Sequence, residues 1–179
     1  MRKTYVLALF LILGIFPLAG QNSGIIYGDN WSYLIMAPDG FQWDSTTLQS
    51  QGIWGLFYKT DQDKYYGNKL NMYINPVVKG NGYPSTIDEL IQWDTDFYKK
   101  NNPSLVITYY KDFELGDSKK ARGYYFDDKQ KGYYLLFSYI TEEKASFVFV
   151  MSARSIEERI ENENAYAELL KSFIYINKT

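Results

Sequence analysis

Apolar and polar residues alternate along several short segments of the chain, which is the period of β-strands that bury one face. In KLNMYINPVV, residues 69–78, the apolar side chains of Leu70, Met72 and Ile74 fall at every second position. The segment 53–59 is apolar almost throughout, which predicts a strand buried on both faces. Similar patterns predict further strands at residues 31–37, 105–110, 121–126, 133–140 and 146–153.

A helical period of 3.6 residues replaces this alternation after residue 86. Ser85 or Thr86 can cap the helix, and an acid three residues later, Asp88 or Glu89, completes the signature of a capping box. The helix should end before Pro103, which cannot continue it. One apolar face is expected to pack on the sheet, and it consists of Ile87, Leu90, Ile91, Phe97 and Tyr98.

A second helix is predicted near the end of the chain. It should begin at Ser155, where Glu158 offers another capping box. Its apolar side is expected to contain Ile156, Ile160, Ala167 and Leu170. The apolar segment 172–176 then predicts a short edge strand.

Runs of adjacent strands without βαβ alternation indicate an antiparallel sheet covered by helices. The sequence therefore predicts an α+β fold, with a central antiparallel sheet of about six to seven strands and two main helices. No internal repeat and no change in composition suggests a second domain.

The first residues have the three-part pattern of a secretory signal peptide. Arg2 and Lys3 precede a continuous apolar run at residues 5–16, Pro17 interrupts the run, and small residues extend to Gly20. This run is shorter than the roughly 18 apolar residues that span a bilayer. We expect residues 1–20 to be removed near Gly20, although a buried N-terminal helix is the alternative. Residues 21–179 would then form a single exported domain, periplasmic or secreted, with no transmembrane segment.

The chain contains no His and no Cys. This composition excludes Ser-His-Asp and Cys-His catalysis, disulfides and Cys/His zinc sites. Residues 1–20 carry two basic residues and no acids, so their removal changes the formal net charge from −2 to −4. A mildly acidic chain does not favour binding to nucleic acid. The sequence therefore predicts no catalytic residue, no cofactor and no metal site.

Two pairs of acidic residues could be exceptions, one as a calcium site and one as a catalytic pair. Asp61 and Asp63, with Gly67 behind them, are spaced like the start of a calcium loop, but Lys64, Tyr65 and Tyr66 occupy the places where further oxygen ligands are needed. Asp127 and Asp128 are neighbours in a polar turn and should share one exposed environment, whereas a catalytic acid pair needs two different environments. Neither pair is expected to be a site.

Asp94 is the least expected residue of the first helix. At about 100° per residue it falls about 20° from Ile87, between Leu90 and Ile91 and inside the apolar stripe. A carboxylate buried there needs a partner, such as a tyrosine hydroxyl, a backbone amide or Arg122 on a facing strand. We expect a buried or half-buried Asp94 with a structural role; a functional group with a perturbed pKa is the alternative.

The order of several short motifs resembles the PsbP-like superfamily. PDGFQW at residues 38–43 is similar to the Pro-x-Gly-Trp segment of that family, although Phe41 follows the glycine directly and Trp43 comes two residues later. The other similar segments are STIDEL, ARGYYF, FVFVMSA and ELLKSF. The resemblance spans residues 31–173 and implies an α/β/α sandwich around an antiparallel sheet. It supplies no catalytic residues, because the family's common role is docking to larger assemblies.

Aromatic residues are the remaining candidates for binding. The chain has 18 tyrosines, and Tyr65 and Tyr66 form a doublet inside a polar loop, where at least one ring should be exposed. Phe41 and Trp43 are expected to cover the end of the core, with the rim of a binding site as the alternative.

Two hypotheses for the function follow from these observations. The first is an exported, non-enzymatic binding or accessory protein that docks to an envelope component or a partner protein. The alternative is a carboxylate-dependent glycan hydrolase or a carbohydrate-binding module. A hydrolase would need two carboxyl groups about 5–9 Å apart in one cleft, with one of them desolvated.

Overall fold

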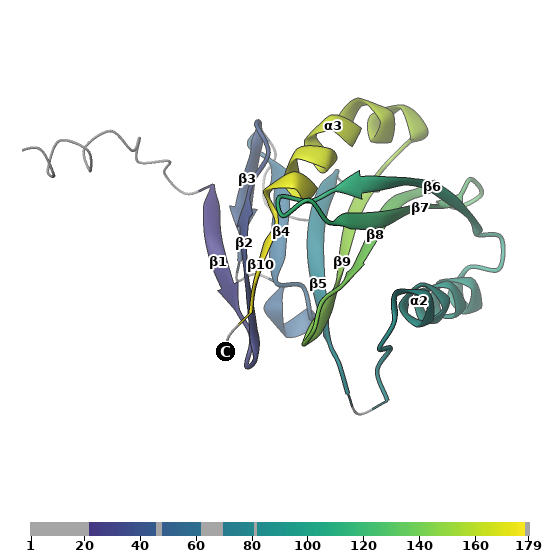
Figure 1. The fold of residues 1–179 in the computed structure, drawn as a ribbon. Coiled ribbons are helices and arrows are strands. Elements are labelled where there is room, and N and C mark those ends of the chain that lie inside the picture. Colours follow the sequence, from purple (N-terminus) through teal and green to yellow (C-terminus); the bar gives the residue numbers. More distant parts are fainter. Residues whose placement is uncertain (1–21, 46–47, 62–69, 81, 178–179) are drawn as a thin grey trace, which may run out of the picture.

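The computed structural model describes residues 22–45, 48–61, 70–80 and 82–177 (Figure 1). Within these ranges the α-helices are α2 (Ile87–Asn101) and α3 (Ile156–Ser172), and a short 3-10 helix, η1, covers Gln49–Gln51. The strands are β1 (Ser23–Tyr27), β2 (Trp31–Met36), β3 (Phe41–Asp44), β4 (Gly55–Lys59), β5 (Asn71–Val78), β6 (Val106–Glu114), β7 (Lys120–Asp128), β8 (Tyr133–Thr141), β9 (Ala145–Ala153) and β10 (Ile174–Asn177).

Seven strands form one large sheet, sheet B, in the order β3-β4-β5-β9-β8-β7-β6. All of its neighbouring strands are antiparallel. Along β8, Leu135 and Phe137 point to one face of the sheet, and Leu136 and Ile140 point to the other. Both faces of the sheet are therefore buried at this strand. The predicted α+β class and the predicted number of strands in the central sheet are confirmed.

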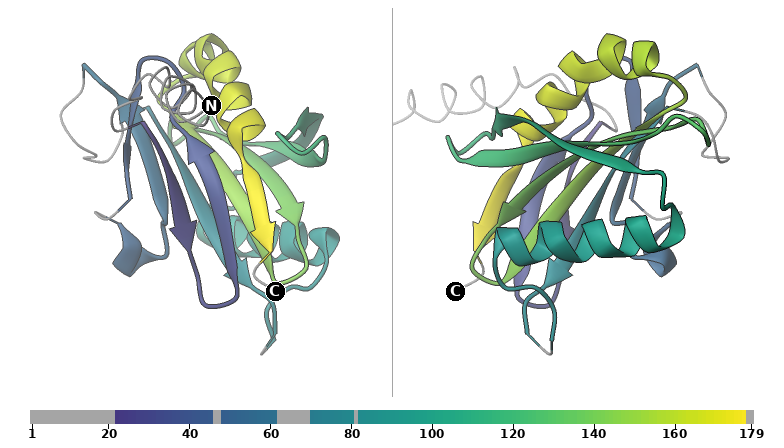
Figure 2. Two further views of the ribbon diagram at one scale, coloured as in Figure 1. Left: turned by 60° about the vertical axis from the view of Figure 1, so that its left-hand side comes forward. Right: turned by 90° about the vertical axis from the view of Figure 1, so that its right-hand side faces the viewer.

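The two helices lie on opposite faces of sheet B (Figure 2). Leu90 of α2 packs into the apolar cluster that contains Leu135 and Phe137. Tyr166 and Leu169 of α3 pack into the cluster on the other face. Neither helix in the described ranges combines the length and the apolar character needed to cross a bilayer.

The two helix starts follow the sequence signals to different degrees. Thr86 caps α2 and forms a complete capping box with Glu89, as predicted. At α3, Ser155 accepts a hydrogen bond from the Glu158 amide, but the Glu158 carboxylate bonds Arg154 instead of the cap. The predicted face of α3 is also wrong at Ile160, which is exposed.

Polar residues explain why the buried face of α3 differs from the predicted face. The helix buries Arg159 and Asn162 together with Tyr166, Leu169 and Leu170. Arg159 pairs with Asp127 of β7, and the Asn162 side chain donates to the Glu158 carbonyl oxygen. Because these polar groups have partners, they can be buried. The buried side of α3 therefore includes polar residues, and a pattern of apolar residues alone does not locate it.

Three strands form a second sheet, sheet A, in the order β1-β2-β10. Strand β10 is the predicted edge strand, and it pairs with β2 from the other end of the chain, with Ile174 opposite Leu34. The sequence analysis did not predict β1. The inner face of sheet A, which contains Tyr33 and Ile35, belongs to the same core as α3. Sheet A therefore lies beside α3 over one face of sheet B, as Figure 1 also shows.

Phe41 and Trp43 belong to β3, an edge strand of sheet B that the sequence analysis also missed as a strand. Phe41 is buried, and Trp43 packs against the same core from its periphery. A Cβ at Gly24 of β1 would lie 2.0 Å from the Trp43 ring, so the indole is pressed against the backbone of sheet A. Both aromatics thus cover the end of the core, as expected, and Phe41 also lines a shallow surface pocket with Lys59 and Asn162.

Gly123 of β7 allows a first prediction about stability. A Cβ at this position would lie 2.7 Å from the Lys111 carbonyl oxygen and 2.7 Å from the Phe113 ring, where the pairing of β6 and β7 is irregular. Backbone cannot move aside as a flexible side chain does, so Gly123→Ala should lower the free energy of unfolding by about 2 kcal/mol or more in urea denaturation.

The matched control for this variant is Gly55→Ala. Gly55 is also a buried strand glycine, but its Cβ would meet its nearest neighbours at 3.5 Å, an ordinary van der Waals distance. Gly55→Ala should therefore change stability by less than about 1 kcal/mol. Equal losses in the two variants would contradict the close approach of β6 to Gly123.

Candidate functional site

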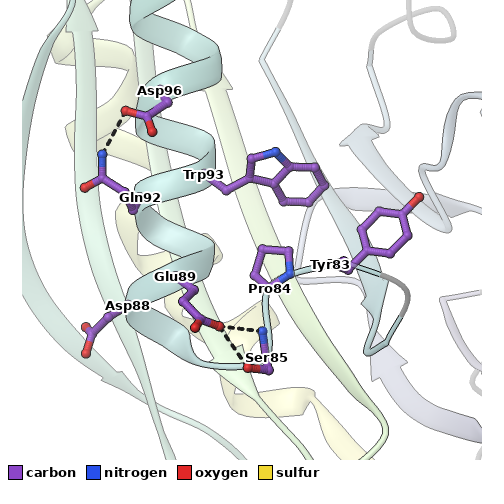
Figure 3. A pocket seen from close by; sticks show the side chains of 9 residues that line it. Tyr83, Pro84, Ser85, Asp88, Glu89, Gln92, Trp93 and Asp96 are labelled. Atoms are coloured by element: carbon purple, nitrogen blue, oxygen red, sulfur yellow. Dashed lines mark hydrogen bonds between the residues drawn. The ribbon is translucent and has the colours of Figure 1, made fainter.

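An open groove lies where the chain turns into α2. Tyr83, Pro84 and Ser85, just before the helix, form one wall, and the solvent-facing side of the first three turns of α2 forms the other (Figure 3). The groove has a volume of about 710 Å³. This volume is within the roughly 300–1,000 Å³ range of ligand pockets, but the groove is a surface feature and not an enclosed cavity.

The capping box holds the two walls of the groove together. One carboxylate oxygen of Glu89, Oε2, accepts hydrogen bonds from the Ser85 amide at 2.8 Å, the Ser85 hydroxyl at 2.8 Å and the Thr86 amide at 3.1 Å. The bond from the Ser85 amide is the largest of several that lower the pKa of Glu89. The same carboxylate therefore starts the helix and fixes the turn that carries Tyr83.

Large aromatic side chains stand in solvent along this surface. Tyr83 and Trp93 meet edge to face, with ring centroids 5.7 Å apart, and yet remain 53% and 46% exposed. Phe97, one turn beyond Trp93, is 60% exposed. Single exposed apolar residues are common, but three large rings on one helix face and its flanking turn form a patch of the kind found at interaction sites.

The exposure of Phe97 corrects the predicted core face of α2. Leu90 is the one fully buried residue of this helix, and Ile87, Ile91 and Tyr98 pack partly against the same cluster. Phe97 falls about 80° from Ile87 on the helix, at the edge of the predicted stripe. The surface of α2 that contacts the sheet is narrower than the predicted apolar stripe. Phe97 is therefore left exposed, and its ring meets the Tyr98 ring edge to face.

Acidic groups line the groove beside the aromatics. Asp88 forms an ion pair with Arg122 of β7, and Asp96 accepts a hydrogen bond from Gln92 at 2.8 Å. None of the described residues that line the groove is Lys or Arg. The groove is therefore an aromatic and acidic surface.

Asp94 lies on the other side of α2, half-buried against sheet B. Burial raises the pKa of its carboxyl to about 6, and the nearby Tyr139 hydroxyl partly lowers it. The Asp94 Oδ2 atom and the Tyr139 hydroxyl both lack a partner with hydrogen-bond geometry among the described residues. Arg122, considered above as a partner for Asp94, pairs with Asp88.

The positions of the acids bear on the hydrolase alternative. The desolvated acid, Asp94, does not line the groove. Asp88, which does, has a side chain that is 80% exposed, and Glu89 is engaged by the capping box. The described part of the groove thus lacks a desolvated acid, which the general acid of a glycoside hydrolase has to be.

The environments of Asp127 and Asp128 differ from the sequence interpretation. Asp127 pairs with Arg159 of α3, whereas Asp128 is buried and accepts hydrogen bonds from the Ser104 hydroxyl at 2.6 Å and from the Gln130 and Lys131 amides. The Ser104 bond is the largest of the causes that lower the pKa of Asp128. The two acids do not share one exposed environment, because successive strand residues point to opposite faces. Both have structural partners.

Tyr65 and Tyr66 lie outside the described residues, so their proposed role in binding stays a prediction. They fall between β4 and β5 in the sequence, and β5 begins at Asn71, opposite Ser152 near the end of β9. Lys131 of the β7–β8 turn donates a hydrogen bond to the Asn102 side chain at the exit of α2, at 2.6 Å. No group of three or more acidic residues in the described ranges is arranged to hold a metal ion.

Sequence reasoning missed the groove and its aromatic residues. The periodicity that predicted the core face of α2 places Trp93 on the polar side of the helix. A large indole on a polar helix face was the one sign in the sequence of an exposed aromatic surface here. The place of Tyr83 could not be read locally, because it depends on how the turn before Thr86 folds against the helix.

Comparison with known proteins places the fold. No protein-family model matches the sequence, and no curated protein sequence matches it. The solution structure of cyanobacterial PsbP (CyanoP) from Synechocystis sp. PCC 6803 is similar, with a TM-score of 0.51 and 13% sequence identity over 87% of this chain and 94% of that chain. The chain has the PsbP-like α+β fold, as its motifs implied. A second similar structure, the Saccharomyces cerevisiae Ran-binding protein Mog1p, has a TM-score of 0.49 and 11% identity over 86% of this chain and 95% of that chain.

Proposed function

We propose that this protein is an exported binding or accessory protein, without catalytic activity of its own, that docks to a partner protein of the cell envelope through the α2 groove. The observation that carries the proposal is the exposure of Tyr83 and Trp93 in the groove, and of Phe97 one turn beyond it. Aromatic residues are enriched at protein interfaces, where they supply most of the binding energy from few positions.

Two further observations support a binding role. The chain shares its fold with cyanobacterial PsbP (CyanoP), and the family that its motifs resemble is expected to dock to larger assemblies. The acids of the groove are exposed or used by the helix cap, so they are unsuited to general acid catalysis. A rigid surface held by a capping box is better suited to presenting side chains to a partner.

Affinity capture with matched variants tests the docking surface. The double variant Trp93→Ala/Phe97→Ala should lose the captured envelope protein, because it removes two central aromatic contacts. Tyr109→Ala, which removes an equally exposed ring from edge strand β6, should retain it. Circular dichroism should show that both variants remain folded, since none of the replaced rings is buried. Capture that is unchanged in the double variant would contradict the proposed surface.

Export is the second part of the proposal, and it rests on the pattern of residues 1–20. The mature protein should begin at Gln21, because Ala19 and Gly20 offer the small residues that signal peptidase needs. Intact-mass measurement of the protein from the extracytoplasmic fraction tests this prediction. A full-length species in that fraction, with Met1 retained, would contradict cleavage.

A further inference from the structure

The α2 groove has an excess of negative charge. Of its acids, only Asp88 has a cationic partner in the described part of the chain, and that partner, Arg122, does not line the groove. The bonds to Glu89 all involve Oε2, and the bond from Gln92 to Asp96 involves Oδ1. Each of these two carboxylates thus has a second oxygen that is in none of these bonds. The groove is therefore electrostatically complementary to a cation.

The exposed indole of Trp93 lies between these two acids along the helix. Glu89 precedes it by four residues and Asp96 follows it by three, so all three side chains rise from neighbouring positions on one helix surface. In Figure 3, Trp93 and Tyr83 lie to one side of α2, Gln92 and Asp96 lie to its other side, and the Glu89 carboxylate lies near Ser85. The groove therefore presents an aromatic ring and carboxylate groups from one helix surface.

We infer that the groove binds an arginine side chain of the partner, with the guanidinium over the Trp93 indole and its charge balanced by Glu89 and Asp96. This inference rests on the proposed docking function and names the chemistry of the partner. A guanidinium is planar and weakly hydrated, so it stacks on an indole better than a lysine ammonium does. It can also donate hydrogen bonds to two carboxylates at once, because its N–H groups point in several directions.

Blocked tripeptides provide a direct test with a defined probe. Acetyl-Gly-Arg-Gly-amide is titrated into the ¹⁵N-labelled mature protein, and the indole N–H resonances of the four tryptophans are followed. Trp93→Phe assigns the Trp93 resonance. The arginine peptide should shift that resonance saturably and bind roughly fivefold more tightly than its citrulline analogue, which has the same shape without the charge. The lysine peptide should fall between the two.

Charge-removing variants locate the binding to the groove. Glu89→Gln keeps a residue that can complete the capping box, and Asp96→Asn keeps an oxygen for the Gln92 bond, so both should remain folded. Each should weaken the arginine peptide by roughly twofold to threefold, whereas Glu161→Gln, which removes an exposed acid of α3, should not. Added salt should weaken binding to the wild-type protein.

The outcomes separate this inference from the proposed function. Equal binding of the arginine and citrulline peptides, or no shift of the Trp93 resonance, would overturn the inference. A saturable shift with chito-oligosaccharide but not with the arginine peptide would overturn it in favour of a glycan site. If arginine binding fails while capture still depends on Trp93 and Phe97, the docking function stands with a different partner chemistry. If arginine binds in the groove but capture does not depend on these residues, the inference stands and the docking surface is wrong.

Discussion

Asp127→Ala is expected to lower the free energy of unfolding by about 3–5 kcal/mol, because it leaves a buried guanidinium without its partner. Asp127 of β7 pairs with Arg159 of α3, and the two side chains are only 20% and 4% exposed. The Arg159 guanidinium also lies over the Tyr125 ring, 3.7 Å from its centroid. Glu163, one turn later on α3, is already engaged by the hydroxyls of Tyr110 and Tyr125 at 2.7 and 2.6 Å. Urea denaturation measures the loss.

A second ion pair supplies the control for this prediction. Asp88 and Arg122 also join a helix to β7, but their side chains are 80% and 37% exposed. Solvent screens such a pair, so Asp88→Ala should cost no more than about 1 kcal/mol. The double variant Asp127→Ala/Arg159→Met should recover much of the loss, since it removes the unpaired charge. Similar effects of Asp127→Ala and Asp88→Ala would contradict the burial of the Arg159 pair.

Asp94→Asn is expected to stabilise the protein at pH 7 and to have little effect near pH 4. The pKa of Asp94 is raised to about 6 in the folded state, above the ordinary value of 3.8, because its carboxyl is buried. Between these two values the folded state binds the proton more tightly than the unfolded state does. This group therefore contributes stability at low pH that is lost as pH rises toward 6, by up to about 3 kcal/mol.

The difference between two pH profiles isolates the contribution of Asp94. Urea denaturation of the wild-type protein and of Asp94→Asn between pH 4 and pH 7 should give curves that separate as pH rises, with the variant more stable. Asp96→Asn, an exposed acid two residues later on the same helix, should run parallel to the wild type. If Asp94→Asn destabilises the protein at pH 7, the ionised carboxylate has a stronger partner than the Tyr139 hydroxyl.

Local signals in the sequence were sufficient for much of the fold. The capping box of Thr86 and Glu89 was predictable because all of its groups lie within four residues. The alternation of Leu70, Met72 and Ile74 was equally informative, because these three side chains are fully buried on one face. In both cases the physical cause acts within one turn or one strand.

Features that depend on distant pairing were not predictable in the same way. Sheet A forms only because β2 meets β10 from the other end of the chain, and β1 gains its place from that sheet. The burial of Arg159 on α3 likewise depends on Asp127, which is 32 residues away. A prediction from the spacing of apolar residues places a residue such as Arg159 outside the core, because its partner is too distant in the sequence to be considered with it.

The candidate site shows the same division. The sequence suggested Tyr65 and Tyr66 as binding residues, because they are neighbours in a polar segment. The groove instead combines a turn with the outer face of α2. Trp93 and Phe97 became candidates only when the helix was seen to bury a narrow stripe around Leu90. Surfaces of this kind are defined by what the core leaves uncovered.

In-cell photo-cross-linking at Gln92 is the most direct measurement of the central claim that the α2 groove docks a partner protein. Gln92 lines the groove and is exposed, so a benzophenone side chain placed there should reach any bound protein. The same group at Glu168, an exposed position of α3, serves as the control. The account predicts a discrete cross-linked product from position 92 that disappears in the Trp93→Ala background and is absent from position 168. Products of equal yield from both positions, or a product at position 92 that survives Trp93→Ala, would contradict it.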